Sequence, residues 1–516
     1  MRCIIAALPA HRLARAVPMR IQQQKRLFAW DCLEDHPPLA TLKEVVQTIP
    51  DGKLLEGLRA ARGRGRDDYP VRALWGVVVL TIALRHTGFE ACLGELRRNP
   101  ALAKLIGIES EEGLPKGWNV SRFLEVLGQE PHRLELEAAF NAMTKRLGEV
   151  VPDLSQHTAA DSTSLNARKL RSDARQDEEE EKEKEKEKEK AAASASAKKA
   201  KEPIEYDQHG LPQPSGGCKE YTDEKGQVTR KVCWYGYKLH LLVDTKHEVA
   251  LAYRISSTKA GDNEVLPELV DQGRANLPKD RLQTLADDKA ADDAKVHEKL
   301  NACGIKPVIQ IRALWKEDQE KLLPGHDGNS NIVYDEAGTL YCYDRVSDPM
   351  VRRAMAYIGH ERSRGTLKYR CPAMHDGLPC AMSSVGNAGK KYGLTIRVKQ
   401  EIDLRRFPPI PRATKQFERL YKGRTSVERV TARLKIFWGA DDGNVTGATR
   451  FFALVGTVMV VHSAFATLLA SVPRREGTLG KLRLSAMAKA LRTRISETST
   501  KACPAGKPSA ADGPKP

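Results

Sequence analysis

Apolar residues recur every three or four positions through residues 30–150, with charged residues between them. This spacing is typical of amphipathic helices, because it places the apolar side chains on one helical face. Residues 71–86 (VRALWGVVVLTIALRH) are almost wholly apolar but too short to cross a membrane, so they predict a core helix. Residues 118–127 predict another helix, capped by Asn119 or Ser121. We expect a helical bundle, whose basic residues either contact phosphates or only solubilise its surface.

The pattern changes after residue 151, where short strand-like runs alternate with helical segments. Strands mixed with helices at this spacing predict an α/β domain built on one sheet. The predicted strands are residues 157–165, 235–243, 249–256, 282–286 and 305–311.

Residues 313–395 break this rhythm with several glycines, prolines and asparagines, and they predict an insertion into the domain. After it we expect a short strand at 394–398 and one long helix at 417–438. Residues 451–472 (FFALVGTVMVVHSAFATLLASV) carry no formal charge and are long enough to span a bilayer. Because the rest of the chain is highly charged and offers no second clear span, we expect a buried helix. A membrane anchor is the alternative.

Composition divides the chain further. Residues 177–202 hold a Glu/Lys run followed by Ala and Ser, which we expect to form a solvated loop that interrupts the α/β domain. The expected organisation is a flexible N-terminus (1–29), a helical DNA-binding domain (30–150), a first part of the α/β core (151–312), the insertion (313–395), a second part of the core (396–472) and a basic, partly disordered tail (473–516).

The chain is strongly basic, with a formal net charge of +17 over 516 residues. Such a charge favours a polyanionic partner, most commonly nucleic acid. The ten cysteines are spread along the chain, which argues against a secreted disulfide framework and for a reducing, cytoplasmic compartment. The N-terminus lacks the apolar run of a signal peptide. We find no glycine-rich phosphate loop and no nicotinamide fingerprint, so we expect no nucleotide cofactor.

The helix predicted at 417–438 has an unusual polar face. Tyr421, Arg424, Glu428 and Lys435 fall within an arc of about 60° at helical spacing. An apolar stripe on the other side suits packing in a core. A single acid among bases is compatible with a binding site, although a solvated row of ion pairs would give the same pattern.

These four residues, separated by two, three and six positions, resemble the Tyr-Arg-Glu-Lys signature of a large group of bacterial insertion-sequence transposases. The resemblance implies a ribonuclease H-like catalytic domain of α/β class, preceded by an all-helical N-terminal domain. It also implies that Glu428 is the third acid of a DDE site, and that Tyr421, Arg424 and Lys435 contact transposon-end DNA.

The other two acids are expected on strands upstream. Asp161 in AADSTSL resembles the family's first aspartate, and WYGYKLH resembles the strand that follows it. Asp288 opens DKAAD, where the family has Asp, Lys or Arg, Gly, Tyr, Asp. The neighbouring Asp287 remains the competing register. The resemblance extends to YPVRALWGVVVL and WNVSRFLEVLG near the N-terminus, and it spans about residues 30–470.

Three carboxylates suit the expected chemistry. Two divalent ions can stabilise both the attacking and the leaving oxygen of a phosphodiester, and hard ions prefer oxygen ligands. We therefore expect Asp161, Asp288 and Glu428 to bind two Mg²⁺ or Mn²⁺ ions. The implied reaction nicks double-stranded DNA at terminal inverted repeats and joins the freed 3′-hydroxyl to target DNA. The family also implies a homodimer, associated with the nucleoid and not with a membrane.

Two further functional interpretations remain open. Because two alanines replace Gly and Tyr in DKAAD, the chain could be an inactive DNA-binding descendant of a transposase. It could also be a metal-dependent nuclease of the same fold that does not join strands.

A second cluster lies in the insertion. Cys342, Cys371, His375 and Cys380 could form a structural zinc site. The spacing is looser than a standard pair of cysteine ligands, and free cysteines often serve only as small apolar residues. Both interpretations stay open.

Overall fold

The computed structural model describes residues 37–64, 68–168, 203–222, 228–315, 320–325, 331–382, 391–442 and 445–471. The expected flexible N-terminus, the loop at 177–202 and the basic tail lie outside these residues. The described part contains helices, one mixed sheet and two antiparallel sheets, which agrees with the predicted α/β class.

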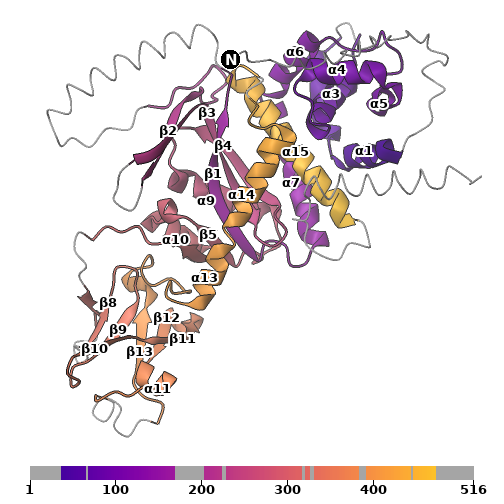
Figure 1. Ribbon diagram of the computed structural model, residues 1–516. Coiled ribbons are helices and arrows are strands. Elements are labelled where there is room, and N and C mark those ends of the chain that lie inside the picture. The colour runs from indigo at the N-terminus through magenta and orange to yellow at the C-terminus, as the bar shows by residue number, and fades with distance from the viewer. Residues whose placement is uncertain are drawn as a thin grey trace, which may run out of the picture.

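Helices dominate the chain before the first strand (Figure 1). They are α1 (Pro37–Thr48), α2 (Gly52–Arg62), α3 (Val71–Ala83), α4 (Phe89–Arg98), α5 (Pro100–Leu105), α6 (Gly117–Leu127) and α7 (His132–Val150). The predicted core helix is α3, which is buried over most of its length. The expected caps of α6 were wrong: the helix begins at Gly117, and Asn119 accepts a hydrogen bond from the backbone N–H of Lys116 (3.1 Å).

The main sheet holds both antiparallel and parallel strands. Its members are β1 (His157–Asn166), β2 (Ser215–Thr222), β3 (Val228–Asp244), β4 (Ala250–Ser257), β5 (Thr284–Asp287) and β6 (Lys306–Ile309). The order is β2-β3-β1-β5-β6, with β4 also paired to β3. β3 runs antiparallel to β1, whereas β5 runs parallel to β1 and to β6. The five predicted strands are all present, but β2 and the first part of β3 were not predicted.

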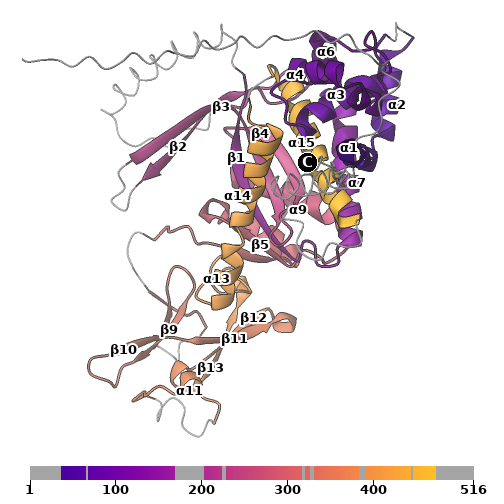
Figure 2. The same cartoon turned by 45° about the vertical axis from the view of Figure 1, so that its right-hand side comes forward.

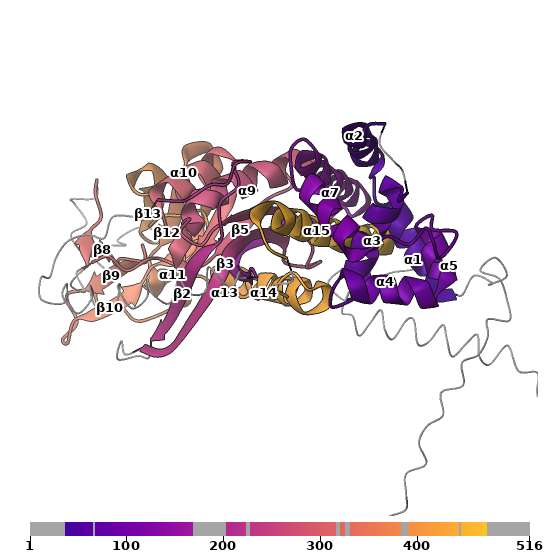
Figure 3. The same ribbon diagram turned by 90° about the horizontal axis from the view of Figure 1, so that it is seen from above.

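Two apolar cores cover the two faces of this sheet. Side chains alternate along β1, so Ala159 and Leu165 join the core shared with the helices before β1 and with the C-terminal helices. Ala160 joins the core on the opposite face, with residues of α9 (Asp262–Asn276) and α10 (Ala294–Ala302). Figure 3 shows the sheet between these helical layers.

The insertion folds around a small core of its own. One sheet comprises β7 (Lys321–Leu322), β8 (Ile332–Tyr334), β9 (Leu340–Asp344) and β10 (Val351–Ala354), and the other comprises β11 (Ala356–Glu361), β12 (Thr366–Arg370) and β13 (Thr395–Lys399). Leu340, Leu367 and Ile396 are among the residues that fill the space between them. The strand predicted at 394–398 therefore pairs with β12 of the insertion and not with the main sheet.

The predicted long helix at 417–438 is not one continuous α-helix. It comprises α13 (Lys415–Lys422), α14 (Thr425–Ala432) and a π-helical turn, η5 (Arg433–Phe437). At the junction, Arg424 and Ser426 each donate a backbone hydrogen bond to the residue three positions earlier, so the α-helical pattern tightens there.

The apolar helix α15 (Ala448–Ser471) lies at the centre of the molecule (Figure 1). It is long and apolar enough to cross a membrane, but 83% of its most apolar window is buried in the structure. It packs against α1, α3, α6 and α7 on one side. On the other side, the ring of Phe451 contacts that of Tyr237 on β3 (4.5 Å between centroids). The prediction of a buried helix is confirmed.

One pair of cysteines contradicts the expectation of reduced thiols. Cys218 on β2 and Cys233 on β3 occupy opposite positions of an antiparallel pair and form a disulfide. Side chains directly opposite each other in such a pair lie close together, which composition alone could not reveal.

Candidate active site

Asp161 lies within β1, on the face of the sheet that α14 covers. Its carboxylate accepts hydrogen bonds from the backbone N–H of Ser162 (2.8 Å) and from the guanidinium of Arg424 (2.9 Å). Burial raises the pKa of Asp161, while the Ser162 N–H and the Arg424 charge act in the opposite direction. The nearby charge of Asp288 raises this pKa further, which places the two carboxylates in one electrostatic environment.

The parallel pairing of β1 and β5 determines which aspartate faces Asp161. Ala159 is paired with Ala286, so Asp288 follows two residues later, as Asp161 does on β1. Because side chains alternate along a strand, Asp288 lies on the Asp161 side of the sheet and Asp287 on the other. Asp287 is buried, and this burial raises its pKa well above the ordinary value. The geometry therefore favours Asp288 over Asp287 as the partner of Asp161.

Asp288 also shapes its own turn. Its carboxylate accepts a hydrogen bond from the backbone N–H of Ala290 (2.7 Å), and so caps the 3-10 turn η2 (Lys289–Ala291). Ala290 contributes a backbone group to this contact, and Ala291 is buried in the core below. The two alanines that depart from the family motif therefore maintain the local turn through their backbone and their small size.

Arg424 connects two acids that are far apart in the sequence. It donates to Asp161 on β1 and, at 3.0 Å, to Glu428 on α14. The side chain of Glu428 is 56% exposed, whereas that of Arg424 is 23% exposed. A single cation thus lies between the two carboxylates, where their combined charge would also suit a divalent ion.

Tyr421 and Lys435 flank this arrangement at different places. The ring of Tyr421 stacks on Phe417 (5.8 Å between centroids), and burial raises its pKa, to which the charges of Asp288 and Asp287 contribute. Lys435 lies in the π-helical turn and forms an ion pair with Asp441 (3.2 Å). The structure therefore brings Tyr421 to the acids, but it places Lys435 beside a different carboxylate.

Asp441 in turn shows where Lys435 lies along β1. Its carboxylate accepts a hydrogen bond from the backbone N–H of Asn166 (2.6 Å), the last residue of β1. The polar residues of α14 and η5 therefore extend along β1 from Asp161 to Asn166, the last residue of the strand.

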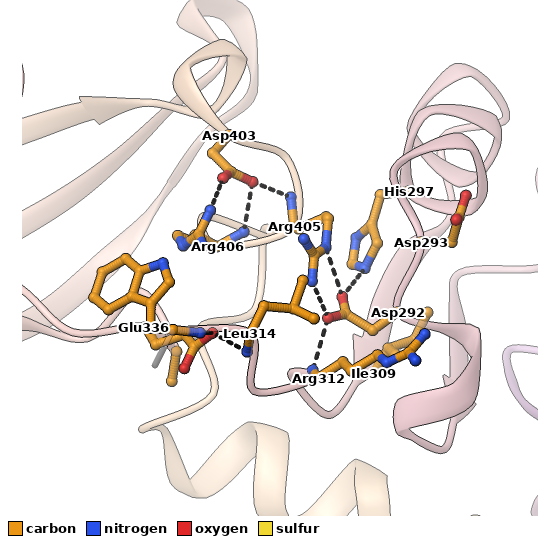
Figure 4. Close-up of polar contacts among 12 residues, drawn as sticks. Asp292, Asp293, His297, Ile309, Arg312, Leu314, Glu336, Asp403, Arg405 and Arg406 are labelled. Atoms are coloured by element: carbon orange, nitrogen blue, oxygen red, sulfur yellow. Dashed lines mark hydrogen bonds and ion pairs between the residues drawn. The ribbon is translucent and has the colours of Figure 1, made fainter. Parts of the chain in front are cut away.

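Asp292, the last residue of DKAAD, takes a role that the sequence did not predict (Figure 4). Its fully buried carboxylate accepts hydrogen bonds from His297 (3.1 Å), from the backbone N–H of Arg312 (2.7 Å) and from Arg405 (2.6 Å), and it lies 3.8 Å from Arg412. Burial would raise the pKa of Asp292, but the bonds from His297, Arg405 and Arg312 outweigh it and hold this pKa below the ordinary value. Asp292 thus joins the end of β5 to the segments that precede and follow the insertion.

The cysteines of the insertion lie near one another but do not form a four-ligand site. Burial raises the pKa of Cys342 to about 11, and the nearby thiols of Cys371 and Cys380 contribute. His375 is instead directed toward Asp376 (3.9 Å). In the part of the chain that the structure describes, no group of three or more His, Cys, Asp or Glu side chains is arranged to hold a metal ion. This finding applies also to Asp161, Asp288 and Glu428, because Arg424 lies between Asp161 and Glu428.

Acids on two adjacent parallel strands, faced by a helix that carries a third carboxylate, define an α/β domain with a carboxylate-lined site. Residues 152–463, more than half of the chain, match the model of the Transposase DDE domain family, and the protein belongs to this family. No curated protein matches the chain. Membership implies a polynucleotidyl transferase-type enzyme with a DNA substrate, in a family that generally uses divalent metals.

Proposed function

We propose that the protein is a DNA transposase that cleaves transposon ends and joins them to target DNA by a cut-and-paste reaction. Asp161, Asp288 and Glu428 would hold two Mg²⁺ or Mn²⁺ ions. As the Tyr-Arg-Glu-Lys resemblance to bacterial insertion-sequence enzymes implies, the enzyme would act as a homodimer on paired terminal inverted repeats. The observation that carries the proposal is the contact of Arg424 with both Asp161 and Glu428, next to Asp288 in the parallel register.

The order of the main sheet supports a ribonuclease H-like catalytic domain. Three antiparallel strands (β4, β3 and β1) are followed by the parallel strands β5 and β6. The acids belong to the central strand β1, to the end of its parallel neighbour, and to the helix packed across them. This arrangement brings carboxylates from three elements to the same side of the sheet, and such oxygen ligands suit phosphodiester chemistry with two ions.

When bound, the divalent ions would stabilise charge on the attacking and leaving oxygens of the phosphodiester. The chain's own residues prepare this site. Arg424 forms ion pairs with both Asp161 and Glu428, so the two carboxylates lie on either side of its guanidinium group. A guanidinium group can also form two parallel hydrogen bonds to a phosphate. Tyr421, packed on Phe417, supports Arg424 from one side.

Cleavage of a labelled duplex that carries the element's own terminal repeat tests this proposal. We would compare the native protein with Glu428→Gln, in Mg²⁺ or Mn²⁺. The matched control is Glu418→Gln, because Glu418 is an exposed acid on α13 that forms an ion pair with nearby Lys422 (2.7 Å). We expect nicking at the repeat boundary by the native and control proteins and none by Glu428→Gln.

The same assay separates the alternatives. Tight binding without nicking by the native protein would favour an inactive DNA-binding descendant. Nicking without a strand-transfer product would favour a nuclease of the same fold. The intact turn around Asp288 and Ala290 supports the active enzyme over the inactive one.

A further inference from the structure

A two-stranded ribbon projects from the main sheet (Figure 2). It consists of β2 and the first part of β3, paired from Ser215 opposite Gly236 outward. Its Cys218–Cys233 disulfide fixes the pairing covalently. In the described residues, β2 pairs with β3 alone, and the adjacent residues Cys218 and Lys219, which lie on opposite faces of the ribbon, are both exposed.

The ribbon leaves the sheet at a sharp bend. Gly236 has φ +152°, and a Cβ atom there would lie 2.1 Å from the carbonyl oxygen of Leu165 and 2.7 Å from the backbone nitrogen of Ala167. Only glycine fits such close approach of two backbones. The direction of the ribbon relative to β1 therefore depends on this one residue.

The bend directs the ribbon to the side of the main sheet on which α13 and α14 lie (Figure 3). Asp161 lies on this same face of the sheet, which α14 covers. Along β3, Asp161 is paired with Leu241, and Lys219 is paired with Val232, nine positions earlier. The ribbon therefore stands beside the face that carries the acids, with Lys219 nearer to the sheet than Arg230.

The ribbon is also basic where its side chains are described. Lys219, Arg230 and Lys231 are exposed. Arg230 lies two positions beyond the partner of Lys219 on the same strand face, and Lys231 lies on the other face. A two-stranded ribbon fits a DNA groove, and cations spaced along it would neutralise successive phosphates. A second protein copy would instead favour an apolar surface at the centre of the contact.

We propose that the β2–β3 ribbon is a clamp for the DNA strand at the cleavage site, with Lys219 on a phosphate beside the scissile one and Arg230, on the same face of the ribbon, on a phosphate farther out. The inference rests on the proposed function, because the strand must enter between the ribbon and α14. Neither Lys219 nor Arg230 belongs to the Tyr-Arg-Glu-Lys face. The ribbon thus adds a second, independent set of contacts to the same strand.

Salt-dependent binding of the terminal-repeat duplex, followed by fluorescence anisotropy without divalent metal, tests the clamp. The test variant is Lys219→Ala/Arg230→Ala. The charge-matched control is Lys279→Ala/Lys295→Ala, which removes two exposed cations beside α9 and in α10, on the opposite face of the sheet. Loss of two phosphate contacts should reduce the slope of log Kd against log salt by about 1.8, and the control should leave it unchanged. Circular dichroism would verify that both variants are folded, and Lys219→Gln alone should reduce the slope by about 0.9.

An unchanged slope in the ribbon variants would overturn the clamp, and so would equal reductions in ribbon and control variants. If the slope is unchanged but sedimentation shows loss of a dimer, the ribbon binds a second copy of the chain, and the proposal is wrong. The readout is independent of cleavage. A native protein that fails to nick DNA but shows the ribbon-specific slope refutes the transposase proposal and retains the clamp.

Discussion

Neutralising Asp292 should loosen the joint between the core and the insertion. The carboxylate of Asp292 has no solvent exposure, and the side chains of Arg405 and Arg412 around it are 17% and 7% exposed. Asp292→Asn leaves these guanidinium groups buried without their counter-charge. Removing one partner of a buried ion pair costs about 3–5 kcal/mol. At roughly 2–4 °C per kcal/mol for a cooperative unit of about 150–250 residues, Tm should fall by roughly 6–20 °C.

Thermal unfolding and limited proteolysis of Asp292→Asn measure this effect, with Asp293→Asn as the control. Asp293 caps α10 by accepting a hydrogen bond from the backbone N–H of Lys295 (2.9 Å), and Asn caps helices equally well. We expect new cleavage near the ends of the insertion only in Asp292→Asn. A Tm within about 2 °C of the native value would refute the reasoning, because it would mean that the buried charges need no partner.

The pH dependence gives a second measure of the same joint. The folded-state pKa of Asp292 is held below its ordinary value of 3.8, so its contribution is present above that pH and is lost as the pH falls through the folded-state pKa. The acid-side loss of stability should therefore be smaller in Asp292→Asn than in the native protein. Urea unfolding at pH 5 and pH 3 checks this difference. Parallel acid-side losses in the two proteins would contradict it.

Three further predictions follow from close contacts and burial. Gly128→Ala should reduce the free energy of unfolding by about 1–3 kcal/mol, because the added Cβ would lie 1.9 Å from the carbonyl oxygen of Thr449. Urea unfolding measures this change, and Gly94→Ala is the control, because a Cβ at Gly94 would meet no atom within 4 Å. The pKa of buried His462 is lowered to about 3 by burial, so the neutral ring that accepts from the Ala250 N–H is favoured. Its stabilising effect should be complete above pH 6.5 and should decline by up to about 1.4 kcal/mol per pH unit below it, a slope that His462→Gln should lack in urea unfolding. Gly236→Ala should redirect the ribbon and weaken binding of the terminal-repeat duplex in the anisotropy assay, whereas Gly216→Ala, with no atom near its Cβ, should not; equal binding by both would contradict the role of the bend.

The sequence predicted the parts of the site that depend on local periodicity. Asp161 lies on a predicted strand, and Glu428 shares a helical face with Arg424, so spacing alone brought these residues into view. The choice between Asp288 and Asp287 needed the parallel register, which joins strands more than a hundred residues apart. The partners of Asp292 were hidden for the same reason, since Arg405 lies 113 residues away.

The predictions were wrong where backbone geometry overrides periodicity. The tightened junction at Gly423 and Arg424 and the following π-helical turn leave no mark in the apolar pattern of this segment. The strand β2 (SGGCKEYT) was missed because it lacks the alternating apolar residues of a half-buried strand. The strand pairs with β3 outside the core, so it does not need an alternation of apolar and polar residues.

The position of α15 has a consequence for synthesis of the chain. This helix is translated after every other described element, yet it completes the core of helices that are translated first. Until it emerges, α3 and the Tyr237 face of β3 lack the side chains that cover them. We expect the nascent chain to expose these apolar surfaces throughout translation, with folding completed only at its end. A premature stop before α15 should therefore yield an aggregating fragment and not a shorter working protein.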